Sequence, residues 1–131
     1  MAAAGSAIGR ALGGLDSALA LLIGMMAADY ITGVLVAALW HRSNKSATGA
    51  LDSKAGFKGL CKKGAVLLVV YIGALLDRAL GADYARNAFV LFFCGNEGLS
   101  LLENLGLMGV PYPPALQKML EALREEGENE K

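Results

Sequence analysis

Long apolar runs fill most of this 131-residue chain, and each of them contains acidic side chains. A carboxylate at the centre of a bilayer costs about 2.5–3.5 kcal/mol on insertion scales. We therefore expect these acids to face protein or water, and not lipid. The runs cover residues 18–40, 60–80 and 84–110, and their acids are Asp29, Asp77, Glu97 and Glu103.

The composition favours a membrane protein. The chain is 55% apolar and only 18% charged, which is too apolar for an ordinary small soluble domain. A transmembrane helix needs about 20 apolar residues to cross roughly 30 Å of hydrocarbon. The sequence therefore predicts an all-α membrane protein with three transmembrane helices, a basic interfacial segment and a C-terminal amphipathic helix. The third run is interrupted by polar groups, and a soluble bundle of very apolar helices is the alternative.

The basic residues are unevenly distributed. Six Lys and Arg residues lie in the segment 41–63 and three in the tail 111–131, which together hold nine of the twelve in the chain. Basic residues stay on the cytoplasmic side. Three spans therefore predict an outside N-terminus and a cytoplasmic C-terminus. If the third run stays peripheral, two spans place both termini outside.

The domain organisation follows from these runs. A small-residue segment, 1–17, lies on the outer leaflet or forms a flexible tail. The transmembrane domain, 18–110, contains the basic cytoplasmic loop 41–63. Part of that loop has an apolar and a basic side, which favours a helix lying on anionic lipid over a solvated loop. Its membrane-surface lysines are Lys54, Lys58, Lys62 and Lys63.

The region 111–131 is predicted to be a cytoplasmic amphipathic helix followed by a polar tail. Pro111 and Pro113 stop the third helix. Pro114 suits the first position of a new one, and apolar residues at helical spacing follow it. We expect this helix to lie on the membrane or to pack beneath the bundle. The tail 124–131 is polar enough to be disordered.

A polar stripe runs along the third predicted helix. Helical spacing places its members on one face, where they line water or form hydrogen bonds to another helix. Asp29 lies at a similar depth, and we expect no intramembrane Lys or Arg to accompany it. The candidate residues for a helix interface or a water-lined space are Asp29, Asp77, Asn96, Glu97, Ser100, Glu103 and Asn104.

Several kinds of chemistry are not expected. The chain has a single His, His41, and two widely separated cysteines, Cys61 and Cys94, so neither a metal site nor a disulfide is predicted. There is no nucleotide-binding loop, and we expect no enzyme, cofactor, catalytic residue or nucleic-acid partner. The run 18–40 is longer than a usual signal-peptide core, and a basic loop follows it, which indicates a retained span.

Six short motifs follow one another along the chain. They are Asp29-Tyr-Ile-Thr-Gly33, the segment Ser53 to Lys63, Leu76-Asp77, Asn96-Glu97-Gly-Leu-Ser100-Leu-Leu-Glu103-Asn104, Gly109-Val-Pro111 and Pro113-Pro114-Ala-Leu116. The fourth motif lies inside the third run and carries most of its polar groups. In this order the motifs resemble the toxin-secretion and phage-lysis holins, a family that includes the clostridial toxin-release holin. The resemblance covers roughly residues 18–124.

The resemblance implies a phage or prophage protein without catalytic chemistry. Such a protein oligomerises in the bacterial (host) cytoplasmic membrane and opens lesions, which release an endolysin or a toxin and lead to host cell lysis. The polar positions given above are then candidate oligomer- or lesion-lining residues. Its partners would be membrane lipids, further copies of itself, and functionally the endolysin or toxin. Two other classes fit the residues: a small ion channel or proton-coupled transport subunit, and a membrane scaffold or antiholin-like regulator.

Overall fold

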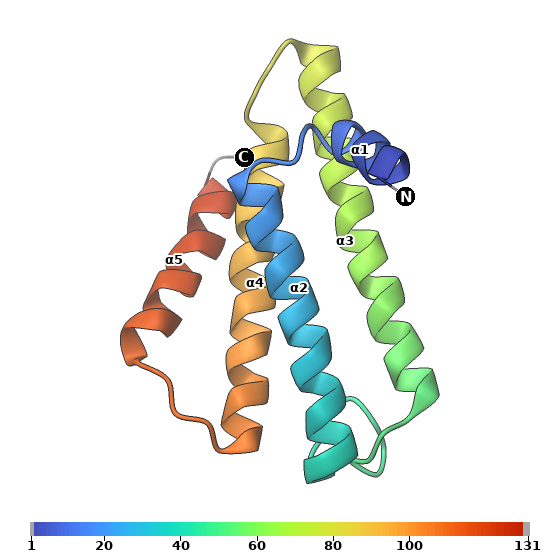
Figure 1. Ribbon diagram of the computed structural model, residues 1–131. Helices are drawn as coiled ribbons and strands as arrows, with labels where there is room; N and C mark the ends of the chain where they lie inside the picture. Colours follow the sequence, from blue (N-terminus) through green and yellow to red (C-terminus); the bar gives the residue numbers. More distant parts are fainter. Residues whose placement is uncertain (1, 130–131) are drawn as a thin grey trace.

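The computed structural model describes residues 2–129, and every regular element in that range is a helix (Figure 1). A π-helical turn, η1, extends the second helix, so the two form one continuous segment, Ser17–Trp40. The elements are α1 (Ala2–Ala11), α2 (Ser17–Leu35), η1 (Val36–Trp40), α3 (Ser53–Leu80), α4 (Ala85–Met108) and α5 (Pro114–Asn129).

The helix boundaries have local causes. The Asp16 carboxylate accepts a hydrogen bond from the Leu19 amide at 2.9 Å and caps α2, and Asp52 caps α3 in the same way. Gly81 and Gly109 end α3 and α4 in the left-handed conformation, with φ of 62° and 78°, which glycine adopts without steric cost. Pro114 begins α5 as predicted.

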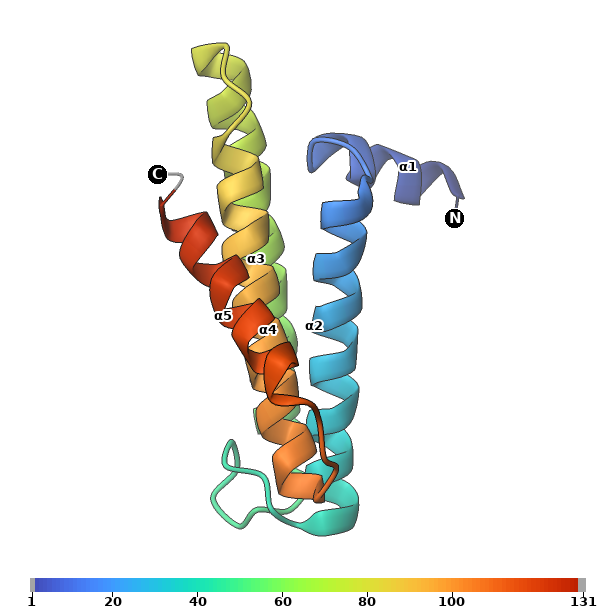
Figure 2. The ribbon, with the colours of Figure 1, turned by 90° about the vertical axis from the view of Figure 1, so that its left-hand side faces the viewer.

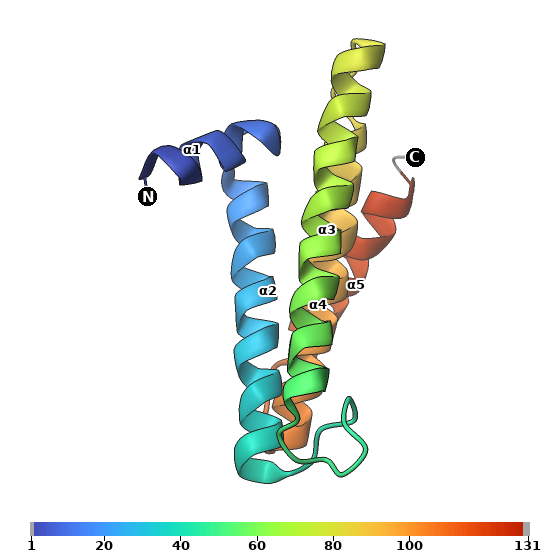
Figure 3. The same ribbon diagram turned by 90° about the vertical axis from the view of Figure 1, so that its right-hand side faces the viewer.

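Helices α2, α3 and α4 run side by side in alternating directions, and α4 packs against both of the others (Figures 1 and 2). Helix α1 lies crosswise to α2 at the end where α2 begins, and it points away from the other helices (Figure 3). Helix α5 returns antiparallel along α4, and this is the most extensive helix pair in the fold.

The α4–α5 pair is close because glycines lie at its contacts. A Cβ added at Gly95 would come within 2.5 Å of the Leu120 carbonyl oxygen, and one at Gly127 within 2.5 Å of the Ala88 carbonyl oxygen. Gly98 receives the Leu120 side chain. Helix α5 therefore packs beside α4, which differs from the expected position on the membrane or beneath the bundle.

Two of the helices are long and apolar enough to cross a membrane. These are Ser17–Trp40 and Ser53–Leu80, and only 28% and 17% of their most apolar windows are buried. The core helix of a soluble protein would be mostly buried. Instead, large apolar side chains such as Ile31 and Leu68 are 58% and 60% exposed. Such extensive exposed apolar surface needs lipid or a partner around it.

The all-helical prediction is confirmed, and two of the expected spans are candidate membrane helices. The third, α4, contains too many polar groups to meet the same test. The basic interfacial segment and the second span, predicted as separate elements, form one 28-residue helix, α3. The tail predicted to be disordered is helical as far as Asn129, and residues 130–131 lie outside the described range.

Candidate functional site

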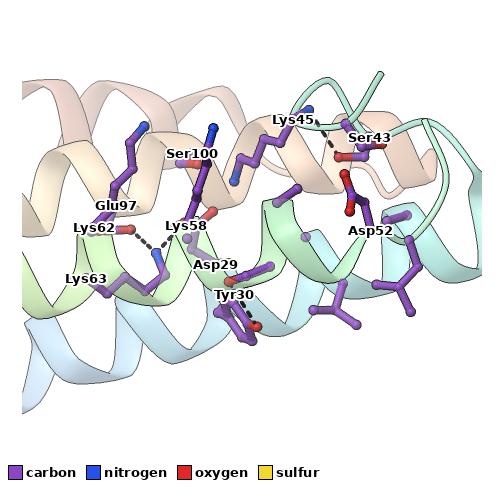
Figure 4. Close-up of a pocket in the computed structure, with 18 of the residues that line it drawn as sticks. Asp29, Tyr30, Ser43, Lys45, Asp52, Lys58, Lys62, Lys63, Glu97 and Ser100 are labelled. Atoms are coloured by element: carbon purple, nitrogen blue, oxygen red, sulfur yellow. Dashed lines mark hydrogen bonds and ion pairs between the residues drawn. The ribbon is translucent and has the colours of Figure 1, made fainter. Parts of the chain in front are cut away.

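A largely buried lysine joins the three long helices inside the bundle. Lys63 Nζ of α3 donates to Asp29 Oδ2 of α2 at 2.7 Å and to Glu97 Oε2 of α4 at 2.8 Å (Figure 4). The three side chains are 14%, 4% and 10% exposed, respectively. One ammonium group therefore serves two carboxylates that are largely shielded from solvent. We call these three residues the ion triad.

The ion triad corrects one expectation and reinterprets one residue. The expectation that no Lys or Arg would accompany Asp29 is wrong, because Lys63 forms ion pairs with Asp29 and Glu97. The sequence places Lys63 at the membrane surface with Lys54, Lys58 and Lys62. In the structure Lys63 is the eleventh residue of α3 and pairs with Asp29, half-way along the segment Ser17–Trp40.

A helical pattern in the sequence points to this position. Lys63 precedes Val66, Val70, Gly73 and Asp77 at intervals of three or four residues, which places all of them on one face of α3. This face is turned toward α2 and α4, as the burial of Val70 and Gly73 shows. Extending that face to its N-terminal end identifies Lys63 as an inward-facing residue.

Asn104 extends the polar network from the ion triad. Its Nδ2 donates to the Asp29 carbonyl oxygen and to Asp29 Oδ1, both at 3.0 Å, and to Thr32 Oγ1 at 2.9 Å. The Thr32 hydroxyl in turn donates to the Ala28 carbonyl oxygen at 2.7 Å. Among the described residues, no buried side-chain nitrogen or oxygen lacks a partner. The buried polar groups of α4 are therefore satisfied within one chain.

The other members of the polar stripe lie at the edges of this network. Asn96 and Ser100 line a pocket next to the ion triad. Glu103 accepts a short hydrogen bond from the Asn44 amide at the exposed end of the bundle. The structure thus gathers Asp29, Glu97 and Asn104 into one cluster and places the rest around its rim.

Asp77 lies far from this cluster and has a structural environment of its own. Its carboxylate accepts hydrogen bonds from the Ala85 amide at 2.9 Å and the Arg86 amide at 3.1 Å, the first two residues of α4. Tyr84, which precedes α4, supplies no side-chain cap. Asp77 therefore caps α4 from the preceding helix.

Arg86 was not among the candidate site residues, but it holds the N-terminal part of the chain. Arg86 is only 7% exposed. Its guanidinium donates to the Leu12 and Gly14 carbonyl oxygens. It also donates from Nη1 to Asp16 Oδ2 at 2.8 Å. The hydrogen bond from Arg86 lowers the pKa of Asp16. Only the arginine's position near a helix start was visible in the sequence.

A pocket of about 410 Å³ opens beside the ion triad, between α2, α3 and the loop 41–52. Lys63, Asp29 and Glu97 lie at its base (Figure 4). Lys58 and Lys62 line it as well, together with Lys45 from the loop, whereas Lys54 does not. The four lysines predicted to lie at the membrane surface thus have three different environments.

The described residues contain no group of three or more His, Cys, Asp or Glu side chains arranged to hold a metal ion. Cys61 is exposed and Cys94 is buried, and both are free thiols. Two long apolar helices with largely exposed surfaces indicate a small helical membrane protein.

Comparison with known proteins identifies the family. The model of the bacteriophage holin family matches residues 6–125. The chain is 35% identical over 117 residues to an uncharacterised protein of Listeria innocua, covering 88% of this chain and 78% of the relative. It is 36% identical over 113 residues to an uncharacterised 14.9 kDa protein of Clostridium perfringens, covering 85% and 80%.

A relative with an assigned role comes from a phage. The probable holin of Bacillus phage phi105 is 31% identical over 101 residues, covering 76% of this chain and 69% of the relative. No solved structure matches the chain. The chain therefore belongs to the bacteriophage holin family. This family is not enzymatic, and membership suggests a place in the cytoplasmic membrane.

Proposed function

We propose that this protein is a holin that oligomerises in the bacterial cytoplasmic membrane and opens lesions through which an endolysin or a toxin crosses, leading to host lysis. The observation that carries the proposal is the family match over residues 6–125. The exposed apolar surfaces of α2 and α3 support it, since they fit a protein surrounded by lipid and by copies of itself.

In this proposal α4 is the third membrane span. Its 24 residues correspond to about 36 Å of helix, which exceeds the roughly 30 Å of a bilayer core. Among the polar residues that lower its apolar content, Glu97 and Asn104 are buried and have partners within the chain. A polar group that is already paired does not present an unsatisfied donor or acceptor to lipid.

The proposed orientation follows the distribution of basic residues. The N-terminus and α1 lie outside, and the basic loop and the start of α5 at Pro114 lie in the cytoplasm. The segment after α4 begins on the cytoplasmic side, whereas the sequence predicts that all of 111–131 is cytoplasmic. Its helix folds back along α4 in the structure, so its outer face points away from the bundle.

The mechanism that we propose begins from a closed protomer with an intact ion triad. When the protein becomes dense in the membrane, contacts between copies compete with contacts inside each copy. The helices then separate, and water reaches the stripe from Asn96 to Asn104. Hydration stabilises the separated charges and opposes closure, which shifts the population toward the open state. Asn96, Ser100 and Glu103, at the rim, would be hydrated first.

The test is inducible expression of this chain alone in bacteria, while membrane potential and release of a cytoplasmic reporter enzyme are followed. A holin predicts abrupt depolarisation followed by release of the enzyme. Depolarisation with the enzyme retained would instead identify a small channel. If the protein reaches the membrane and neither signal changes, the scaffold or regulator class is correct.

A variant tests the role of the ion triad in this process. Glu97→Leu removes one of the two carboxylates that Lys63 holds, so it should allow insertion but shift or abolish the timing of lysis. Glu125→Leu is the matched control, because Glu125 is exposed on α5 and has no ion pair in the described part of the chain. Normal timing of Glu97→Leu at equal protein level would contradict the mechanism.

A further inference from the structure

We propose that the pocket between α2, α3 and the loop 41–52 binds the phosphate head group of an anionic phospholipid in the cytoplasmic leaflet. The proposal rests on the membrane orientation given above, but it requires no lesion. It is carried by the charge, the shape and the depth of this pocket, taken together.

The net charge of the pocket lining is positive, because four lysines line it against three carboxylates. Two of the carboxylates, Asp29 and Glu97 at its base, share Lys63. Asp52, at the rim, accepts the Lys54 amide as the cap of α3. Three lysines that line the pocket have no ion-pair partner among residues 2–129. They are Lys45, Lys58 and Lys62.

The three unpaired lysines come from two elements that meet at the pocket. Lys58 and Lys62 are four residues apart, so they project from one face of α3, and in Figure 4 their side chains extend in the same direction. Lys45 reaches the pocket from the loop. Mutual repulsion of three ammonium groups is reduced when an anion lies between them, and a phosphate offers several strong acceptor oxygens.

The pocket combines polar and apolar lining, as a lipid head group with its first chain carbons requires. Ser43 and Ser46 supply hydroxyl groups near the lysines. Val34, Ala37 and Leu51 supply apolar surface at the same pocket. Its volume of about 410 Å³ falls within the roughly 300–1,000 Å³ that is usual for small-molecule sites. An inorganic phosphate would leave the apolar part unused.

The depth of the pocket places it at the membrane surface. Helix α3 has 28 residues, or about 42 Å, which exceeds the hydrocarbon thickness by about 12 Å. Its first turns, which carry Lys58, therefore extend into the head-group region on the basic side. Anionic lipids of that leaflet attract lysines near the surface. The pocket thus opens where phosphate head groups are concentrated.

The experiment measures lipid retention by the purified full chain. The wild-type protein in mild detergent is mixed with equal amounts of phosphatidylglycerol and phosphatidylcholine, and native mass spectrometry counts the lipid retained per protein. We expect a preference for phosphatidylglycerol. Each lysine should contribute about fivefold, so the variant K45A/K58A/K62A should lower that preference by roughly a hundredfold. The variant K45R/K58R/K62R should retain it.

The matched control is R42A/K54A/K118A, which removes three exposed positive charges that do not line the pocket. If this control loses the preference for phosphatidylglycerol to the same extent, the preference depends only on total positive charge and the proposal is wrong. The proposal is also wrong if the wild-type protein retains the two lipids equally. Circular dichroism of each variant checks that the helices are intact.

A second arm separates a lipid from a free phosphate. Inorganic phosphate at millimolar concentration is added to the protein with bound phosphatidylglycerol. Retention of the lipid supports a lipid site, because the apolar lining contributes to binding. Displacement at the same concentration from the wild-type protein would identify a site for free phosphate and overturn the lipid assignment. Lysis is not a readout, so failure of the proposed function would leave this result unchanged.

Discussion

Replacement of Lys63 by Met should destabilise the protein more than any other single removal of a positive charge from α3. Asp29 Oδ2 and Glu97 Oε2 lie 2.7 and 2.8 Å from the same Nζ, so they are no more than about 5.5 Å apart. Without the ammonium group, two negative charges at that distance repel by about 3 kcal/mol at an effective dielectric constant of 20. Removal of one partner from a buried ion pair costs about 3–5 kcal/mol.

The expected loss is therefore at least about 3 kcal/mol of unfolding free energy, or more than a hundredfold in the ratio of folded to unfolded protein. Titration of the purified protein from mild detergent into denaturing detergent, followed by circular dichroism, measures this free energy. Lys62→Met is the matched control, since Lys62 is the adjacent residue but is exposed and forms no ion pair in the described chain.

A compensated variant tests the cause of the loss. D29N/K63M/E97Q removes all three charges together, and Asn at position 29 can still accept from Asn104. Neutral replacement of a buried charged group costs much less than leaving one charge unpaired. This variant should therefore regain most of the stability lost in Lys63→Met. If Lys63→Met is no less stable than Lys62→Met, the ion triad does not hold the bundle together.

Three further perturbations test other parts of the fold. Asp77→Ala removes the acceptor of two α4 amides and should lower the unfolding free energy by about 0.5–2 kcal/mol, measured by the same titration. Gly127→Leu should detach α5 from α4 and raise its rate of proteolysis, whereas Gly106→Leu, with open space around it, should not. Because Arg86 lowers the pKa of Asp16, the stabilisation from Asp16 is complete above its unfolded pKa and is lost as pH falls through the lower folded value. The stability difference between the wild-type protein and Asp16→Asn should therefore shrink below about pH 4. An Asp16→Asn difference that stays constant down to pH 2 would contradict the assignment.

The helix ends were the most predictable part of the fold, because they depend on local chemistry. Pro114 marks the start of α5 through the geometry of its own ring. The run 84–110 gave α4 to within two residues at each end. By contrast, the merging of the basic segment with the second span was not predicted, because the Gly residues of 51–63 lower local helix preference without breaking the helix.

The partners of the charged residues were less predictable, because they depend on packing between distant segments. Hydropathy places Lys63 at the edge of a span, and only the position of its side chain relative to Val70 and Gly73 shows that it faces inward. Amphipathicity predicted α5 but not the surface that it covers. That surface is defined by glycines, such as Gly95, whose missing side chains leave no hydrophobic signal in the sequence.

The fold-back of α5 has a consequence for when the protein can act. The outer face of α5 carries four exposed charged residues. On its inner face, Arg124 contacts α4 at Gly95, which lies about half-way along α4. If α4 spans the membrane as proposed, a lone protomer holds charges beside the hydrocarbon, each costing about 2.5–3.5 kcal/mol at mid-depth. When neighbouring copies enclose water against the outer face of α5, the charges are hydrated, and every copy in the assembly loses this free-energy cost together. The gain appears only when enough copies meet, so accumulation would proceed without effect until a threshold density is reached, and the onset would then be sudden. The four residues are Lys118, Glu125, Glu126 and Glu128.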